Sequence, residues 1–186
     1  MQLGTLLPLG DIGGAPTVVR EYAQAAEAIG YDFVEAPDHV LGASEASASE
    51  PGRTGGGLFH DPFVLFGFLA GCTTKLGFST GVLILAQRQT VLVAKQAASV
   101  AVLSGDRLRL GVGISPWPED FAAMGLPWEK RGARMDEAVD IVRGLTAGGW
   151  FEYDGDVWKR PSSRHRRRLV TVSVLSWAAR KPSPRW

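Results

Sequence analysis

Residues 75–114 read KLGFSTGVLILAQRQTVLVAKQAASVAVLSGDRLRLGVGI, and this stretch decides the fold class. Residues 75–85 are rich in apolar and β-branched side chains, which is typical of a buried strand. Residues 91–103 have the length and composition of a helix that ends at Ser104-Gly105, and residues 107–114 read as another strand. A strand, a helix and a second strand in succession predict parallel strands joined by a right-handed helical crossover.

The same alternation extends towards both ends of the chain. We expect further strands at residues 2–9 and 31–36 and further helices at residues 17–29, 61–73 and 131–145. Asp61 followed by Pro62 is a strong helix start, because Asp caps free N–H groups and proline suits the first helical position. These segments make four βα units, so the sequence predicts an α/β protein. Four units suit a small doubly wound sheet or half of a (β/α)8 barrel, and periodicity alone does not choose.

Composition narrows the class of protein further. The chain has 186 residues, of which 45% are hydrophobic and 21% are charged, as in one ordinary globular domain. Its single cysteine, Cys72, excludes an internal disulfide framework and indicates a reducing compartment. Residues 1–10 lack the features of a secretory signal, and no apolar run reaches the roughly 20 residues of a membrane span. We therefore expect a cytoplasmic protein that has no membrane partner.

Charge divides the chain into two parts. Residues 1–158 carry 11 Lys and Arg against 19 Asp and Glu, whereas residues 159–186 carry 9 Lys and Arg and no acid. We therefore expect a folded body at 1–158 and a basic, atypical tail at 159–186. The basic run at 164–168 has two interpretations: a patch for nucleic acid or another anion, or an incidental tail such as a shifted reading frame produces. Because no aromatic interleaving or binding motif accompanies it, we do not expect nucleic acid as a partner.

Five segments, read in order, resemble the luciferase-like monooxygenase family. They are Pro37-Asp38-His39-Val40, residues 76–83 (LGFSTGVL), residues 94–98 (AKQAA), residues 103–113 (LSGDRLRLGVG) and residues 131–137 (RGARMDE). Each is weak alone, but their order and spacing are specific and cover residues 1–158. The branch of the family that uses the deazaflavin coenzyme F420 is the most similar, and other members bind FMN.

The resemblance implies a (β/α)8 TIM barrel, here truncated to about four βα units. It also implies an oxidoreductase or monooxygenase that transfers a hydride between a small-molecule substrate and coenzyme F420, with FMN as the alternative. TIM barrels usually hold phosphate after strands 7 and 8, which this sequence does not offer. Two interpretations of the function therefore stay open: an enzyme, and a truncated, non-catalytic remnant. A half barrel would also leave strand edges and one face uncovered, so a homodimer is an expected partner.

The resemblance assigns catalytic roles to Asp38 and His39 at the end of the second strand. His39 matches the family histidine that faces the cofactor ring, and histidine exchanges protons near neutral pH. Asp38 is expected to orient His39 or to hydrogen-bond the ring. Without the resemblance, Asp38 would read as a loop cap and His39 as an ordinary surface histidine.

Cofactor contacts are expected from Thr80, Gly81 and Val82 at the end of the third strand and from Gly113 at the end of the fourth. The resemblance implies a non-proline cis peptide bond between Gly81 and Val82 beneath the ring, whereas the residues alone suit a glycine bulge. Gly113 suits either a cofactor contact or close packing. Thr80 would offer a hydroxyl group.

The chain departs from the family after Gly113, where Ile114-Ser115-Pro116-Trp117 stands in place of the Gly-Trp or acidic residue that is common there. This puts a catalytic carboxylate at that position in doubt, and Trp117 is expected to line the pocket or pack in the core. Arg131 and Arg134 are expected to fix the start of their helix. No His, Cys, Asp or Glu cluster has the spacing of a metal site, so we expect no metal.

Overall fold

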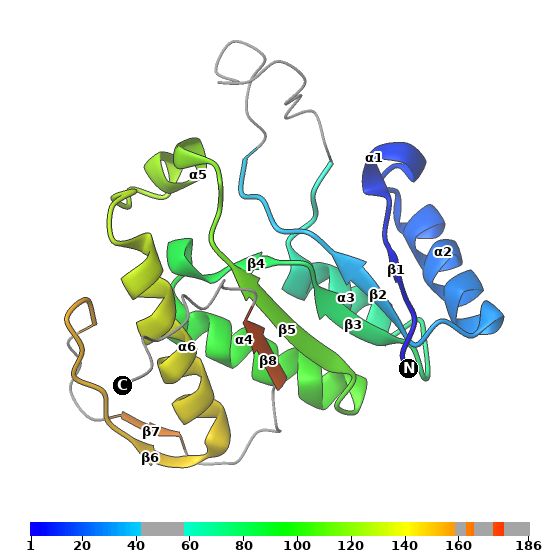
Figure 1. Ribbon diagram of the computed structural model, residues 1–186. Coiled ribbons are helices and arrows are strands. Elements are labelled where there is room, and N and C mark those ends of the chain that lie inside the picture. Colours follow the sequence, from blue (N-terminus) through cyan, green and yellow to red (C-terminus); the bar gives the residue numbers. More distant parts are fainter. Residues whose placement is uncertain (42–57, 159–162, 166–172, 177–186) are drawn as a thin grey trace.

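The computed structural model describes residues 1–41, 58–158, 163–165 and 173–176 (Figure 1). Strands and helices alternate over most of this length. The described strands are β1 (Gly4–Leu6), β2 (Phe33–Ala36), β3 (Gly77–Thr80), β4 (Leu83–Ile84), β5 (Leu108–Gly113), β6 (Gly149–Phe151), β7 (Ser163–His165) and β8 (Ser173–Ser176). The described helices are α1 (Leu9–Ile12), α2 (Pro16–Ile29), α3 (Pro62–Ala70), η1 (Leu85–Gln87), α4 (Thr90–Ser104), α5 (Pro118–Ala123) and α6 (Arg131–Ala147).

The main sheet is parallel throughout. β1 pairs with β2, β2 with β3, and β5 pairs with β3 and β4 on one side and with β8 on the other. β6 and β7 form a separate antiparallel pair. A parallel sheet with helical crossovers confirms the expected α/β class.

β3 and β4 are two parts of one strand, interrupted at Gly81-Val82. Ser79 pairs with Arg109, and Leu83 pairs with Val112. Three residues therefore lie between the paired positions on β3–β4, against two on β5. The extra residue is the signature of a bulge, which locally breaks the pairing of two strands.

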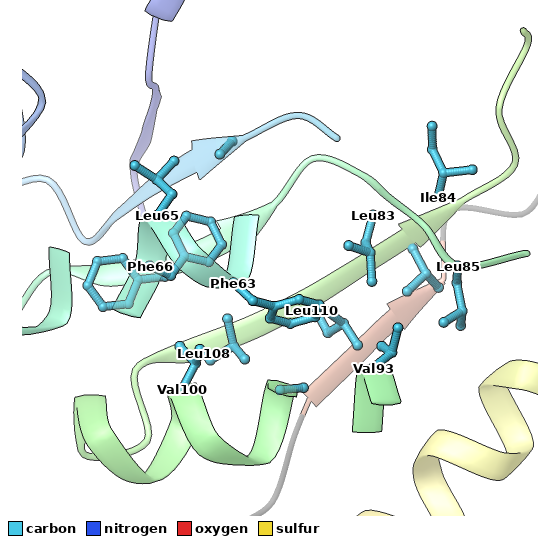
Figure 2. Packing of buried hydrophobic residues seen from close by; sticks show 14 of the residues in the cluster. Phe63, Leu65, Phe66, Leu83, Ile84, Leu85, Val93, Val100, Leu108 and Leu110 are labelled. Carbon is cyan, nitrogen blue, oxygen red and sulfur yellow. The ribbon is translucent and has the colours of Figure 1, made fainter. Parts of the chain in front are cut away.

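The helices pack on one face of the sheet, and the hydrophobic core lies between the helices and the sheet (Figures 1 and 2). α3 contributes Phe63 and Phe66, which are 4% and 0% exposed, and Phe66 stacks on Phe78 of β3 at 5.3 Å between ring centroids. Figure 2 shows Leu108 and Leu110 of β5 beside Val100 of α4. Alternate strand residues face this layer, and the alternation is clearest in β2, which buries every second residue, whereas β3 and β5 also bury consecutive residues.

Local signals explain where the helices begin and end. Asp61 accepts hydrogen bonds at Oδ1 from the N–H groups of Phe63 and Val64, which confirms it as the cap of α3. Gly30 and Gly105 end α2 and α4 in the left-handed conformation, which glycine adopts at little cost.

The structure differs from the expected elements in several places, among them the expected strand at residues 75–85, which is divided into β3 and β4 and ends in η1, and the unexpected strands β6 and β7. Leu9 belongs to the short helix α1 rather than to the first strand, and α5 was not expected. β8 adds a fifth parallel strand from within residues 159–186, so the edge of β5 that a four-unit body would leave open is paired. The boundary at residue 158 stays a prediction, although β8 lies beyond it. The basic run at 164–168 falls largely outside the described residues.

None of the helices in the described part of the chain covers the opposite face of the sheet (Figure 1). In β2, Val34 and Ala36 are buried against the helices, whereas Phe33 and Glu35 on the other face are only half-buried. The guanidinium of Arg109 lies 5.3 Å from the Phe33 ring centroid, and Leu6 is 54% exposed. In a closed barrel this face would be the interior. None of the helices in the described ranges is long and apolar enough to cross a membrane.

Candidate functional site

The carboxyl ends of the parallel strands meet at one edge of the sheet, where α1 and α5 also lie (Figure 1). Ligand sites in parallel α/β folds form at this edge, because the loops that leave the strands converge there. Asp38 and His39 follow β2, Gly81 and Val82 follow β3, and Gly113 ends β5. The fold therefore brings the expected site residues to a single edge.

His39 is held by three side chains. Its Nδ1 lies 3.1 Å from Oδ2 of Asp120, in the first turn of α5. The imidazole stacks on Trp117 at 3.7 Å between ring centroids, and Phe59 meets it edge-on at 4.9 Å. The side chain keeps 17% of its surface exposed, so His39 is fixed in orientation but still accessible.

Asp38 does not orient His39, and this expectation is wrong. Its carboxylate accepts hydrogen bonds from Nε of Arg88 at 3.0 Å, from Nη2 of Arg88 at 2.6 Å and from the N–H of Ile84 at 3.0 Å. Asp38 is buried, so its charge needs a cation close by, and Arg88 supplies one with two-pronged geometry. A direct contact between Asp38 and a cofactor ring stays a prediction.

Arg88 also donates from Nη1 to Oδ2 of Asp61, at 2.8 Å. Burial opposes its charge, but the hydrogen bonds and charges of Asp38 and Asp61 outweigh this effect and raise its pKa. One side chain thus ties the end of β2 to the start of α3. The triad Asp38–Arg88–Asp61 holds the segment that carries His39.

The peptide bond between Gly81 and Val82 is cis, as the resemblance implies, and it coincides with the one-residue bulge. A Cβ on Gly81 would overlap the present position of the Glu35 side chain, which would have to move to admit it. The two interpretations of this dipeptide, a cis bond and a bulge, are therefore both present in one feature.

The remaining expected cofactor contacts are packed against the protein itself. Thr80 is 1% exposed and donates its hydroxyl proton to the carbonyl of Gly111 at 2.6 Å, which ties β3 to β5. A Cβ on Gly113 would meet Val82 Cγ2 at 2.5 Å, so this glycine is required for close packing. Any cofactor contact through Thr80 or Gly113 stays a prediction.

Asp120 is the site residue that sequence reasoning missed. It lies 81 positions from His39 and is 1% exposed, in a segment that departs from the family pattern. The departure from the family pattern after Gly113 put a carboxylate directly after that residue in doubt. The structure instead places a carboxylate from α5 next to His39. The only available signal was an acidic pair, Glu119-Asp120, at a helix start, and this pattern usually indicates a solvated first turn.

The start of α6 has a structural role, as expected. Arg134 donates to the carbonyls of Pro127 and Glu129, and the guanidinium of Arg131 lies 3.7 Å over the Trp128 ring. Within residues 1–41 and 58–158, no three His, Cys, Asp or Glu side chains gather as metal ligands. Elsewhere, an apolar groove with none of the expected site residues is lined by Gly14, Pro16, Val19, His60, Val64, Leu65 and Phe68.

Comparison with known proteins identifies the family. The family described as luciferase-like monooxygenase matches residues 1–181 of this chain. The chain therefore belongs to the luciferase-like monooxygenase family. The match and β8 both extend past residue 158.

Two relatives and one solved structure are similar to this chain. It is 44% identical over 149 residues to an uncharacterised protein of Mycobacterium tuberculosis, covering 76% of this chain and 52% of that protein. It is 33% identical over 162 residues to the F420-dependent glucose-6-phosphate dehydrogenase of Kribbella flavida, covering 80% and 45%. The structure of riboflavin lyase with modified FMN superposes with a TM-score of 0.76 at 20% identity, covering 95% and 50%. The chain spans about half the length of the curated relatives it matches.

The donor set at the strand ends fits the ring of a flavin or deazaflavin. Sites for small molecules combine aromatic walls with a few fixed polar groups, and Trp117 and the accessible His39 provide both. Arg88, a half-buried cation, already pairs with the carboxylates of Asp38 and Asp61, so this residue is not free to bind a phosphate group.

Proposed function

We propose that this chain carries the ring-facing half of an oxidoreductase site, which transfers a hydride between a small-molecule substrate and coenzyme F420. FMN is the alternative cofactor. F420 is placed first because the relative named for it shares 33% identity, whereas the structure with modified FMN shares 20% and supports the fold alone. The single cysteine suits a reducing compartment and so supports the cytoplasm as the proposed location of the reaction.

The observation that carries the proposal is that His39, at the carboxyl edge of the sheet, is fixed in orientation but still accessible. The imidazole is fixed by Asp120 and by stacking on Trp117, yet it is 17% exposed. A bound deazaflavin or flavin ring would supply the carbon or nitrogen centre that accepts or returns the hydride. His39 would take or give the proton that accompanies the transfer, because a histidine changes protonation near neutral pH. Trp117 would form an apolar wall that excludes water from this side of the ring.

Cofactor binding by the purified chain tests the proposal. Oxidised coenzyme F420 and FMN are titrated separately, with cofactor fluorescence as the readout, into the wild type, His39→Ala and His60→Gln. The wild type is expected to bind one of the two in the submillimolar range, and His39→Ala to weaken binding about tenfold, the effect of losing one strong hydrogen bond. His60 is a matched control, because its Nε2 contacts the carbonyl of Gly14 instead. No binding of either cofactor at millimolar concentration would refute the proposal and favour a non-catalytic remnant.

A second candidate is a dimer of this chain, and the uncovered face of the sheet favours it. Leu6 is 54% exposed on this face, and Phe33 is only half-buried. Apolar surface of this kind is stabilised when a partner covers it. Sedimentation over a wide concentration range tests the pairing, and a monomer at every concentration would exclude it.

A further inference from the structure

We propose that Asp120 is the positioning residue for His39, and that it holds the imidazole in the tautomer protonated at Nδ1. Nε2 is then the atom that exchanges a proton. The use of Nε2 in a reaction rests on the proposed function, whereas the tautomer depends on this chain alone.

The contact that carries the inference lies within hydrogen-bond distance and has a buried acceptor. Oδ2 of Asp120 lies 3.1 Å from Nδ1 of His39, and Asp120 is 1% exposed. A carboxylate has only acceptor sites, so the hydrogen atom between the two groups belongs to Nδ1. In the neutral ring the other nitrogen, Nε2, then carries a lone pair that can accept a proton.

The other oxygen of Asp120 fixes the direction of the carboxylate. Oδ1 accepts a hydrogen bond from the backbone N–H of Leu41 at 3.4 Å. Asp120 therefore binds the segment after β2 at two points, His39 and Leu41. The carboxylate cannot turn away from Nδ1 without losing the second contact.

Among the residues that the structure describes, the groups around His39 leave this role to Asp120. Asp38, next to His39 in the chain, is committed to Arg88 and to the N–H of Ile84. Trp117 and Phe59 restrain the plane of the imidazole but provide no acceptor for Nδ1 along their ring faces. α5 thus supplies both an aromatic wall, from its N-cap residue Trp117, and a carboxylate, from its first turn.

Nitrogen chemical shifts of the histidine ring test the tautomer directly, because protonated and unprotonated ring nitrogens differ widely. The full chain is labelled with ¹⁵N-histidine and measured at a pH where the ring is neutral. The three histidines, His39, His60 and His165, are distinguished with His39→Gln and His60→Gln variants. The Nδ1–H form of His39 is expected to dominate at least about tenfold, since a hydrogen bond to a charged acceptor is strong.

Asp120→Asn is expected to reverse the preference. The asparagine carbonyl can keep the hydrogen bond from Leu41, which turns its NH2 group towards Nδ1 of His39. Nδ1 must then accept, so the Nε2–H form becomes the major tautomer. Glu119→Gln is the matched control, because it removes the same charge from the exposed neighbouring position of α5 and should leave the tautomer unchanged.

The wild-type spectrum is decisive even if Asp120→Asn does not fold. A dominant Nε2–H form of His39 in the wild type would overturn the inference, as would an unchanged tautomer in a folded Asp120→Asn chain. A wild-type Nδ1–H form in a chain that binds neither F420 nor FMN would support the positioning role and refute only the proposed function.

Discussion

Replacing Arg88 with methionine should strongly destabilise the protein, because it leaves a buried charge without its cation. The side chains of Arg88 and Asp38 are 15% and 1% exposed, and their closest N–O distance is 2.6 Å. After the substitution, the N–H of Ile84 remains as a hydrogen-bond donor to Asp38. Removal of one member of a buried ion pair costs about 3–5 kcal/mol.

The contact between Arg88 and Asp61 contributes much less to the free energy of unfolding. Asp61 is 34% exposed, and contacts between partly exposed charges contribute about 0–1 kcal/mol after solvent screening. Asp61→Asn keeps Oδ1, which caps α3, and loses the charge and the Oδ2 acceptor of Arg88. A loss of about 1 kcal/mol or less is therefore expected for this control, against 3–5 kcal/mol for Arg88→Met.

A double variant separates the buried charge from simple loss of packing. Asn at position 38 still accepts from the N–H of Ile84 but has no charge to neutralise. Arg88→Met with Asp38→Asn should therefore be more stable than the sum of the two single changes predicts, by about 0.5–3 kcal/mol.

Urea unfolding followed by tryptophan fluorescence measures all four variants, with the slope of the transition compared to detect changes in the unfolded state. A loss below about 1 kcal/mol for Arg88→Met would contradict the cost given for a buried unpaired charge. Additive single changes would show that Arg88 acts through packing alone.

Two further predictions concern elements away from His39. Burial raises the pKa of Glu27, but hydrogen bonds from the N–H groups of residues 74–76 outweigh burial and lower the pKa. The ionised Glu27 therefore stabilises the fold at pH values above its ordinary pKa, and this stabilisation is lost as the pH falls through the lowered pKa. Urea midpoints of Glu27→Gln should therefore depend less on acidic pH than those of the wild type, with exposed Glu21→Gln as the control. Gly111→Ala should lower the free energy of unfolding by about 3 kcal/mol, because the new Cβ would lie 2.2 Å from a carbonyl oxygen of β3. Gly67→Ala is the control: its Cβ would meet nothing within 4 Å, so the change should add about 0.5–1 kcal/mol of helix stability. Equal melting temperatures for the two alanine variants would contradict this reasoning.

Much of the fold could be predicted from sequence, because each element depends on residues close together in the chain. The apolar run in residues 75–85, the cap at Asp61 and the glycines at 30 and 105 marked strands and helix ends that the structure confirms. β8 was harder, since its pairing with β5 joins residues more than 60 positions apart.

The site was predicted in part. The sequence indicated His39 as a candidate and Gly81-Val82 as an unusual peptide, and the structure brings both to the carboxyl edge. It gave the wrong partner for His39, because Asp38 is the nearest carboxylate along the chain. Strand geometry turns the Asp38 side chain to Arg88, 50 positions away, and α5 brings Asp120 to the imidazole.

The sequence by itself determined the alternation of strands and helices, the family and the position of the candidate histidine, since these depend on local patterns and motif order. Only the tertiary structure decided which carboxylate pairs with Arg88 and which holds His39. A buried charged side chain has lost its water and therefore pairs with an opposite charge that the fold brings close. The segments that meet in this way are distant in the chain, so no periodic pattern in the sequence reveals which of them will pair.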